Sequence, residues 1–132
     1  MDSLAFGHRV LPIMQELPTR LSKLDCAVLC TADGFNVCSL GVSEDQLGRM
    51  AALTSSLLSV AEATLDCISG STQASAPVVT MERGNTTLVG IQVGGTRLPL
   101  LLLLAVRETP LGVILLTIQR SAERIRELLK AS

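Results

Sequence analysis

Few side chains in this 132-residue sequence could perform chemistry, and the most reactive are four cysteines and one histidine. A cysteine thiolate can act as a nucleophile, and cysteine together with histidine can hold zinc. Cys26 and Cys30 are separated by three residues in a stretch typical of a β-strand, with no histidine nearby, whereas zinc ligands are usually more closely paired. The single histidine, His8, has no cysteine or carboxylate at a ligand spacing. We therefore predict no metal site and place His8 on the surface.

The cysteines form no disulfide framework and are consistent with a reducing cytoplasm. The favoured interpretation is that Cys26, Cys30, Cys38 and Cys67 are buried, reduced thiols. A regulatory disulfide between Cys30 and Cys38, across the hairpin that they flank, is the alternative. The first ten residues contain no basic segment followed by an apolar core, so we predict no secretory signal and a cytoplasmic protein.

Sequence motifs of catalysis are missing from the chain. There is no Gly-x-Ser-x-Gly, and Gly94-Gly95-Thr96-Arg97 lacks both the spacing and the lysine of a phosphate-binding loop. The adjacent carboxylates Glu44 and Asp45 are explained by the start of a helix, where the helix dipole favours negative charge. We therefore predict a non-enzymatic protein with no catalytic residues and no cofactor.

The composition points to an interaction between proteins. The net charge is −1 and the only aromatic residues are Phe6 and Phe35, which argues against nucleic-acid binding by charge or by base stacking. Hydrophobic residues make up 48% of the chain and charged residues only 17%. A single domain of this size, spanning residues 1–132, has too few charges to coat its surface, which favours an oligomer that hides part of the apolar excess.

The most apolar stretch, RLPLLLLLAVRETPLGVILLTIQR from Arg97 to Arg120, is long enough to span a membrane. However, Arg107, Glu108 and Pro110 interrupt it at the centre, where an arginine is costly and a proline breaks a helix. We therefore predict no membrane insertion. The first half is typical of a strand covered on both faces, and the second half shows the spacing of an amphipathic helix.

Periodicity and turn residues predict eight elements in the order helix, strand, strand, helix, strand, strand, strand, helix. Asp33-Gly34 and Gly84-Asn85 mark the hairpin turns, and Pro18 predicts a kink or an early end of the first helix. The predicted ranges are 8–23, 26–31, 35–40, 43–68, 78–83, 86–93, 98–106 and 110 onward, with turns at Gly70 and at Gly94-Gly95. The fold class is α+β, with a five-stranded antiparallel sheet sandwiched by helices.

The central helix is apolar on nearly all sides, which is typical of a helix covered on more than one side. It opens with a capping-box pattern at Ser43-Glu44-Asp45-Gln46. One stripe contains Leu47, Met50, Thr54, Leu58, Ala61 and Leu65, and a second contains Leu53, Leu57, Val60, Thr64 and Cys67. Small residues recur every four positions at Ala51, Ser55, Ser59 and Ala63 and would let another backbone approach closely. We predict that one side faces the sheet and another faces a second copy of the chain.

The last helix is amphipathic and carries a strongly charged face, with Arg120, Glu123, Arg124, Arg126, Glu127 and Lys130. Several opposite charges stand three residues apart, and the cationic excess suits a helix C-terminus. A solvated face is the favoured interpretation. A docking surface for an acidic partner is the alternative.

Two stretches and the order of the elements resemble the roadblock family of dynein light-chain-like proteins. Val28-Leu29-Cys30-Thr31-Ala32-Asp33-Gly34-Phe35 is similar to the family's strand, turn and strand, and is followed by a helix rich in small residues. Pro110-Leu111-Gly112-Val113-Ile114-Leu115, leading to Arg120-Ser121-Ala122-Glu123, is similar to the closing helix of bacterial members. The resemblance covers nearly the whole chain and implies the architecture shared by roadblock, longin and profilin-like domains.

The resemblance also implies a homodimer in which central helices pair and the edge strand 78–83 joins two sheets. The residues expected at this interface are Ala51, Ser55, Leu58, Ser59, Glu62, Ala63, Val78, Thr80 and Glu82. Family members regulate or scaffold Ras-like small GTPases, and the expected partner-binding residues here are Arg49, Glu62 and Asp66. A bacterial gliding-motility member activates GTP hydrolysis without supplying an arginine finger, so neither Arg49 nor Arg97 is assigned that role. A structural assembly subunit and a small-molecule sensor remain as alternative functions.

Overall fold

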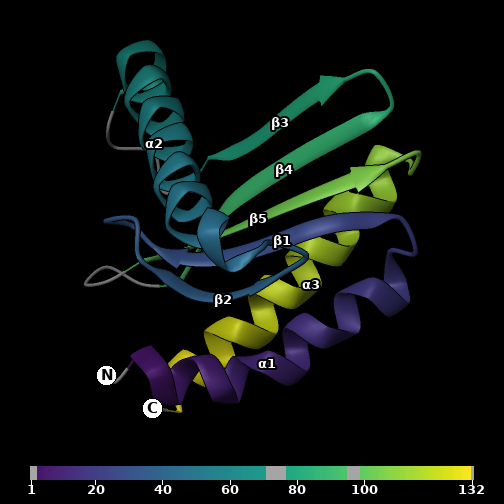
Figure 1. Cartoon of the computed structure of the whole chain (residues 1–132). Coiled ribbons are helices and arrows are strands. Elements are labelled where there is room, and N and C mark those ends of the chain that lie inside the picture. Colours follow the sequence, from purple (N-terminus) through teal and green to yellow (C-terminus); the bar gives the residue numbers. More distant parts are fainter. Residues whose placement is uncertain (1–2, 71–76, 95–98, 132) are drawn as a thin grey trace.

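A computed structural model describes residues 3–70, 77–94 and 99–131 of the chain. Three helices and five strands follow one another in the predicted order (Figure 1). They are α1 (Ser3–Arg20), β1 (Leu24–Thr31), β2 (Asn36–Leu40), α2 (Glu44–Ser69), β3 (Val78–Arg83), β4 (Thr86–Val93), β5 (Leu100–Arg107) and α3 (Leu111–Lys130). The predicted loop residues 71–76 and the residues 95–98, which include Gly95, Arg97 and Leu98, lie outside the described residues.

The strands form one antiparallel sheet in the order β2-β1-β5-β4-β3. Helices α1 and α3 lie on one face of the sheet, and α2 crosses the other face (Figure 1). The sandwich predicted from the sequence is therefore confirmed. The large hydrophobic cluster lies under α1 and α3, and a second, smaller cluster lies under α2.

The central strand β5 is buried on both faces, as its run of leucines predicts. Leu100, Leu102 and Leu104 face α1 and α3, whereas Leu101 and Leu103 face α2. All five side chains are no more than 5% exposed. A strand covered on both faces reads as a continuous apolar run rather than as an alternating one. From Leu100 to Arg120, the apolar stretch thus contains one strand followed by an amphipathic helix rather than one long helix.

The hairpin between β1 and β2 contains the predicted Asp33-Gly34 turn, but the turn is longer than a two-residue loop. Four residues, 32–35, connect the strands, and only Gly34 has a positive φ, of 93°. The Thr31 amide donates a hydrogen bond of 2.8 Å to the carbonyl of Phe35. The other hairpin follows the prediction more closely, since Arg83 pairs with Thr86 across a two-residue loop.

Two predicted details of the helices were wrong. Helix α1 begins at Ser3 rather than near residue 8. It contains Pro12 and Pro18 and ends at Arg20, three residues before the predicted end, as an early end near Pro18 would give. Its buried stripe, which includes Phe6, Val10 and Leu17, is nevertheless the predicted one. Ser43 is the N-cap of α2, but its side chain forms no capping hydrogen bond; its carbonyl instead accepts one from the Gln46 amide at 2.9 Å.

The four cysteines differ in burial. Their positions contradict the alternative of a disulfide between Cys30 and Cys38. Cys30 lies under α2 with Val28, whereas Cys38 pairs with Leu29 and, like Leu29, belongs to the cluster under α1 and α3. Thiols on opposite faces of a sheet cannot be bridged without moving the backbone. Burial raises the pKa of Cys30 to about 12 and also raises the pKa of Cys38. Cys67, predicted to be buried, is exposed, and Cys26 is half-buried.

The turn from β2 into α2 depends on Gly41, which has a φ of 72°. A Cβ at this position would collide with the backbone carbonyl oxygen of Asp25. We expect Gly41→Ala to lower the free energy of unfolding by at least about 3 kcal/mol, because the left-handed backbone and the clash add together. Urea denaturation followed by circular dichroism measures this change.

Gly48→Ala is the matched control, because Gly48 lies in α2 and a Cβ there meets nothing within 4 Å. Alanine replaces glycine in a helix with a gain of about 0.5–1 kcal/mol, so this variant should be slightly more stable than the wild type. Equal stability of the two variants would contradict the assigned role of Gly41.

Candidate interaction surface

Helix α2 is attached to the sheet by one narrow side. Only Ala51, Thr54 and Leu58 are buried among its 26 residues. These three side chains lie over β1 and β5, the strands that α2 contacts most. Met50, Leu57 and Leu47 are half-buried beside them. The first stripe predicted from the sequence is therefore the one that faces the sheet, and the second stripe is mostly exposed.

Polar contacts fix the rotation of α2 about its own axis. The Ser55 hydroxyl donates a hydrogen bond to the carbonyl oxygen of Ala32 in the hairpin turn, and the Cys30 thiol lies 3.6 Å from the Ala51 carbonyl oxygen. A Cβ added to Gly34 would lie 3.5 Å from the Ala52 Cα, which shows how closely the turn approaches the helix. Because these contacts occupy the side of Ala51 and Ser55, the opposite side of α2 points away from the domain.

The outward side of α2 combines small residues with exposed apolar side chains. Ala52, Ser56, Ser59 and Ala63 are all exposed and recur at the spacing of one helix face. Leu53 and Val60 flank this face and are 54% and 65% exposed. Exposed apolar residues gathered on one side of a helix mark a site of contact with another molecule.

The C-terminal half of α2 extends past the sheet (Figure 1). Every residue from Glu62 to Gly70 is exposed, including Leu65 and Ile68 at 45% and 77%. By length and composition alone, α2 could cross a membrane: its mean hydropathy reaches 1.3 over a window that is 17% buried. The sheet contacts of Ala51, Thr54 and Leu58 hold the helix to the domain, so this apolar surface is presented from a folded scaffold.

Strand β3 forms one edge of the sheet and pairs only with β4. Val78, Thr80 and Glu82 are all exposed and lie on the face of the sheet that carries α1 and α3, opposite residues of β4 such as Val89 and Ile91. Met81, on the α2 face, is 52% exposed. An unpaired edge with apolar side chains is a template for pairing with another strand.

The predicted interface residues divide into two groups. Ala51 and Leu58 are 0% and 3% exposed against the chain's own sheet, and the Ser55 hydroxyl is already bonded to the hairpin. Ala51 and Leu58 therefore have almost no free surface for a second chain, and Ser55 is half-buried. The exposed ones are Ser59, Glu62 and Ala63 on α2 and Val78, Thr80 and Glu82 on β3.

The residues predicted to bind a partner do not form one patch. Arg49, Glu62 and Asp66 are all exposed on α2. At about 100° per residue, however, Arg49 points roughly 140° away from Glu62 around the helix axis. Glu62 and Asp66 are one turn apart and form a small acidic flank beside the outward face. Arg97 lies outside the described residues.

Sequence reasoning missed Ala52 and Ser56, which replace Ala51 and Ser55 on the outward face. The chain offers two overlapping series of small residues, 51-55-59-63 and 52-56-59-63, and both have helical spacing. No signal in the sequence distinguishes the two series; only the contacts of Cys30 and Ala32 with α2 place Ala51 and Ser55 on the inward side.

Within the described residues, no group of three or more histidine, cysteine, aspartate or glutamate side chains could hold a metal ion. The cavity between α2 and the sheet that Leu58, Ser59, Glu62 and Leu101 help to line has a volume of only about 70 Å³. Drug-sized ligands occupy roughly 300–1,000 Å³. The geometry of α2 and β3 therefore suits contact with another protein better than catalysis or small-molecule binding.

Comparison with known protein families found no matching family model, and no curated protein matches the sequence. Solved structures do match. The Roadblock/LC7 domain from Streptomyces avermitilis has a TM-score of 0.74 and 26% identity, covering 89% of this chain and 95% of its own. The chain has the roadblock fold.

Two further structures share this fold along nearly their whole length. MglB from Myxococcus xanthus has a TM-score of 0.80 at 16% identity, covering 95% of this chain and 90% of its own. The gliding protein MglB from Thermus thermophilus has a TM-score of 0.74 at 21% identity, covering 93% and 92%. The resemblance drawn from the order of the elements, the hairpin and the last helix is confirmed.

The hydrogen bond from Ser55 to Ala32 should contribute measurably to the stability of this domain. We expect Ser55→Ala to be less stable than Ser56→Ala by about 1 kcal/mol, the usual net value of a hydrogen bond. Both variants exchange a helical serine for alanine, so the gain in helix propensity cancels, and only Ser55 bonds the hairpin. Urea unfolding at one fixed protein concentration gives the difference; identical midpoints for the two variants would show that the bond contributes nothing.

Proposed function

We propose that this roadblock domain is a homodimer that regulates or scaffolds a Ras-like small GTPase and has no catalytic residues of its own. The observation that carries the proposal is the outward face of α2, which is apolar and exposed although its inward side is fixed to the sheet. The roadblock fold supports the same assignment, because the family resemblance implies dimers and small-GTPase partners.

The proposed dimer contact on α2 consists of Ala52, Ser56, Ser59 and Ala63, with Leu53 and Val60 at its flank. Small side chains let two helix backbones approach closely, and the flanking apolar side chains then bury each other. Such a contact also explains why a chain with 17% charged residues carries exposed leucine, valine and isoleucine on one helix. The apolar composition of α2 is thus assigned to protein contact rather than to a membrane.

The open edge of β3 is the proposed second part of the dimer contact. Pairing of two β3 strands would satisfy backbone groups at the edge and cover Val78, which is 50% exposed. A symmetric dimer uses the same surface on both copies, and an antiparallel strand pair meets that requirement. Paired α2 helices on one face of the joined sheet would then offer a continuous platform to a partner.

The GTPase is proposed to bind this platform, with the acidic flank of Glu62 and Asp66 at its edge. No arginine finger is assigned, in keeping with the family member that activates GTP hydrolysis without one. The sensor alternative is not favoured, since the cavity between helix and sheet is about 70 Å³. An assembly subunit would bind its partner equally well with GDP and with GTP present, and the second experiment below separates it from a regulator.

The dimer is tested with the double variant Val60→Asp/Ala63→Asp, which places two carboxylates on the outward face of α2. We expect wild-type protein at micromolar concentration to have twice the 13.9 kDa mass of the chain in light scattering, and the variant to have that mass once. Like charges facing each other across an apolar contact oppose association. Gln15→Asp/Gln119→Asp adds the same charge at exposed positions of α1 and α3 and should remain dimeric. A monomeric wild type would refute the dimer.

The partner class is tested by a pull-down from source-cell lysate, run with GDP and with a non-hydrolysable GTP analogue. We expect a small GTPase, identified by mass spectrometry, to be recovered preferentially in one lane. Recovery should fall with Val60→Asp/Ala63→Asp and persist with Gln15→Asp/Gln119→Asp, because the platform requires paired α2 helices. Recovery of only other proteins, equally in both lanes, would count against the GTPase and favour an assembly subunit.

A further inference from the structure

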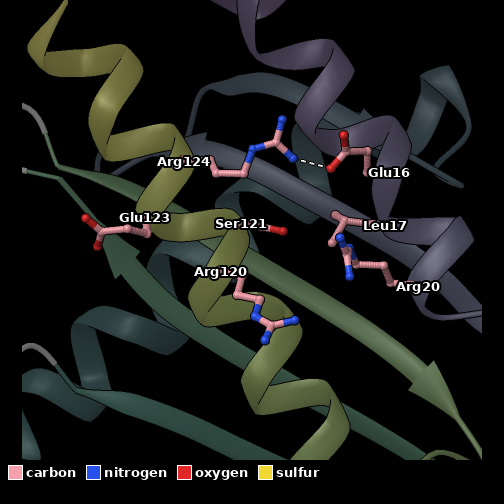
Figure 2. Close-up of a pocket in the computed structure, with 7 residues that line it drawn as sticks. All are labelled: Glu16, Leu17, Arg20, Arg120, Ser121, Glu123 and Arg124. Atoms are coloured by element: carbon pink, nitrogen blue, oxygen red, sulfur yellow. Dashed lines mark hydrogen bonds and ion pairs between the residues drawn. The ribbon is translucent and has the colours of Figure 1, made fainter.

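A groove runs between α1 and α3 on the face of the domain opposite α2 (Figure 2). It consists of two adjoining hollows of about 260 and 700 Å³, which share Glu16, Arg20 and Arg120. The buried side chains of Leu17 and Ser121 lie between the two helices. Two adjoining hollows between two packed helices form a groove that a third helix can fill.

Apolar side chains line the larger hollow on the α3 side. Val113 and Leu116 are 44% and 50% exposed, and Thr117 is buried beside them. Together with Arg120 and Arg124 they follow one helical stripe, distinct from the core stripe of Ile114, Ile118 and Ile125. Helix α3 therefore has two faces with apolar side chains, of which only one packs into the core.

The charge of the groove is positive and is not neutralised by the chain. Arg124 forms an ion pair with Glu16 across the groove, and the Glu123 carboxylate pairs with Arg126 at 3.2 Å. Arg20 and Arg120 form neither an ion pair nor a hydrogen bond within the part of the chain that the structure describes. Two arginines beside an exposed apolar stripe present the complement of an acidic amphipathic segment.

We propose that the α1–α3 groove binds an amphipathic helix of another protein, whose apolar stripe covers Val113 and Leu116 and whose carboxylates bind Arg20 and Arg120. Guanidinium groups bind carboxylates in a bidentate geometry, which fixes the orientation of the incoming helix. The groove lies across the sheet from α2, so this site is independent of the proposed dimer and of the GTPase.

An acidic helix fits the groove better than an anionic membrane does. Recognition of anionic lipids by charge usually involves a cluster of about 4–8 lysine and arginine residues. The groove has two uncompensated arginines, and the whole chain has a net charge of −1. A concave surface between two helices also suits an inserted segment rather than a flat bilayer.

The test is a selection from a displayed library of random helical peptides against immobilised wild-type protein. Counter-selection against Arg20→Glu/Arg120→Glu removes peptides that bind elsewhere, including those that bind α2. We expect the surviving peptides to carry Asp or Glu beside an apolar stripe of i, i+3 and i+4 spacing. An empty pool, or survivors without carboxylates, would overturn the proposal.

Fluorescence anisotropy of the best surviving peptide then gives the affinities of matched variants. We expect each single reversal, Arg20→Glu or Arg120→Glu, to weaken binding at least about tenfold, and Leu116→Ala to weaken it about tenfold. Lys130→Glu makes the same change in net charge as each single reversal at an exposed position outside the lining of the groove, and it should bind like the wild type. Circular dichroism confirms that each variant is folded.

Raising the salt concentration should weaken the complex, because exposed charges are screened. Equal loss of binding in the single groove reversals and in Lys130→Glu would overturn the proposal, since it would show non-specific charge attraction. Binding of wild-type protein to phosphatidylglycerol vesicles, lost in Arg20→Glu/Arg120→Glu, together with an empty peptide pool would assign the groove to a membrane surface instead.

Discussion

The burial of β5 on both faces is the constraint on which the rest of this structure depends. A central strand with five consecutive buried leucines is stable only if both faces of the sheet are covered. Strands β1 and β4 satisfy its backbone hydrogen bonds, and α1 with α3 covers one face while α2 covers the other. The order of the chain follows from this need, because the strand that enters the middle of the sheet comes last and has partners already on both sides.

The two faces are covered unequally, and this asymmetry leaves α2 with an exposed side. Twenty buried residues form the cluster under α1 and α3, whereas six form the cluster under α2. A short helix would be enough to cover Val28, Cys30, Leu101 and Leu103. The 26 residues of α2 therefore exceed what the core requires, and the excess is both apolar and exposed. Stability of the single chain does not explain that excess, whereas the proposed contact with another protein does.

The elements could be predicted because their signals are local. The leucines of β5, the glycines of both hairpin turns and the helical stripe of α1 each depend on neighbours within a few residues. The rotation of α2 could not be predicted, because two series of small residues share Ser59 and Ala63 and only the contact with Ala32 and Cys30 chooses between them. The Cys30–Cys38 alternative failed because Cys38 pairs with Leu29 rather than with Cys30, and a difference of one residue in register places the two thiols on opposite faces of the sheet.

The groove between α1 and α3 was beyond sequence reasoning because it joins segments about a hundred residues apart. From the sequence, the charged residues of α3 fit a solvated face as well as a docking surface. Only the position of α1 shows which arginines of the groove have an acidic partner. Arg124 forms an ion pair with Glu16. Arg120 lines the same hollow as Arg20, which has the same charge and cannot form an ion pair with it. An acidic ligand supplies the carboxylates that Arg20 and Arg120 lack within the described residues, which gives the groove a preference that the outward face of α2, flanked by Glu62 and Asp66, does not share.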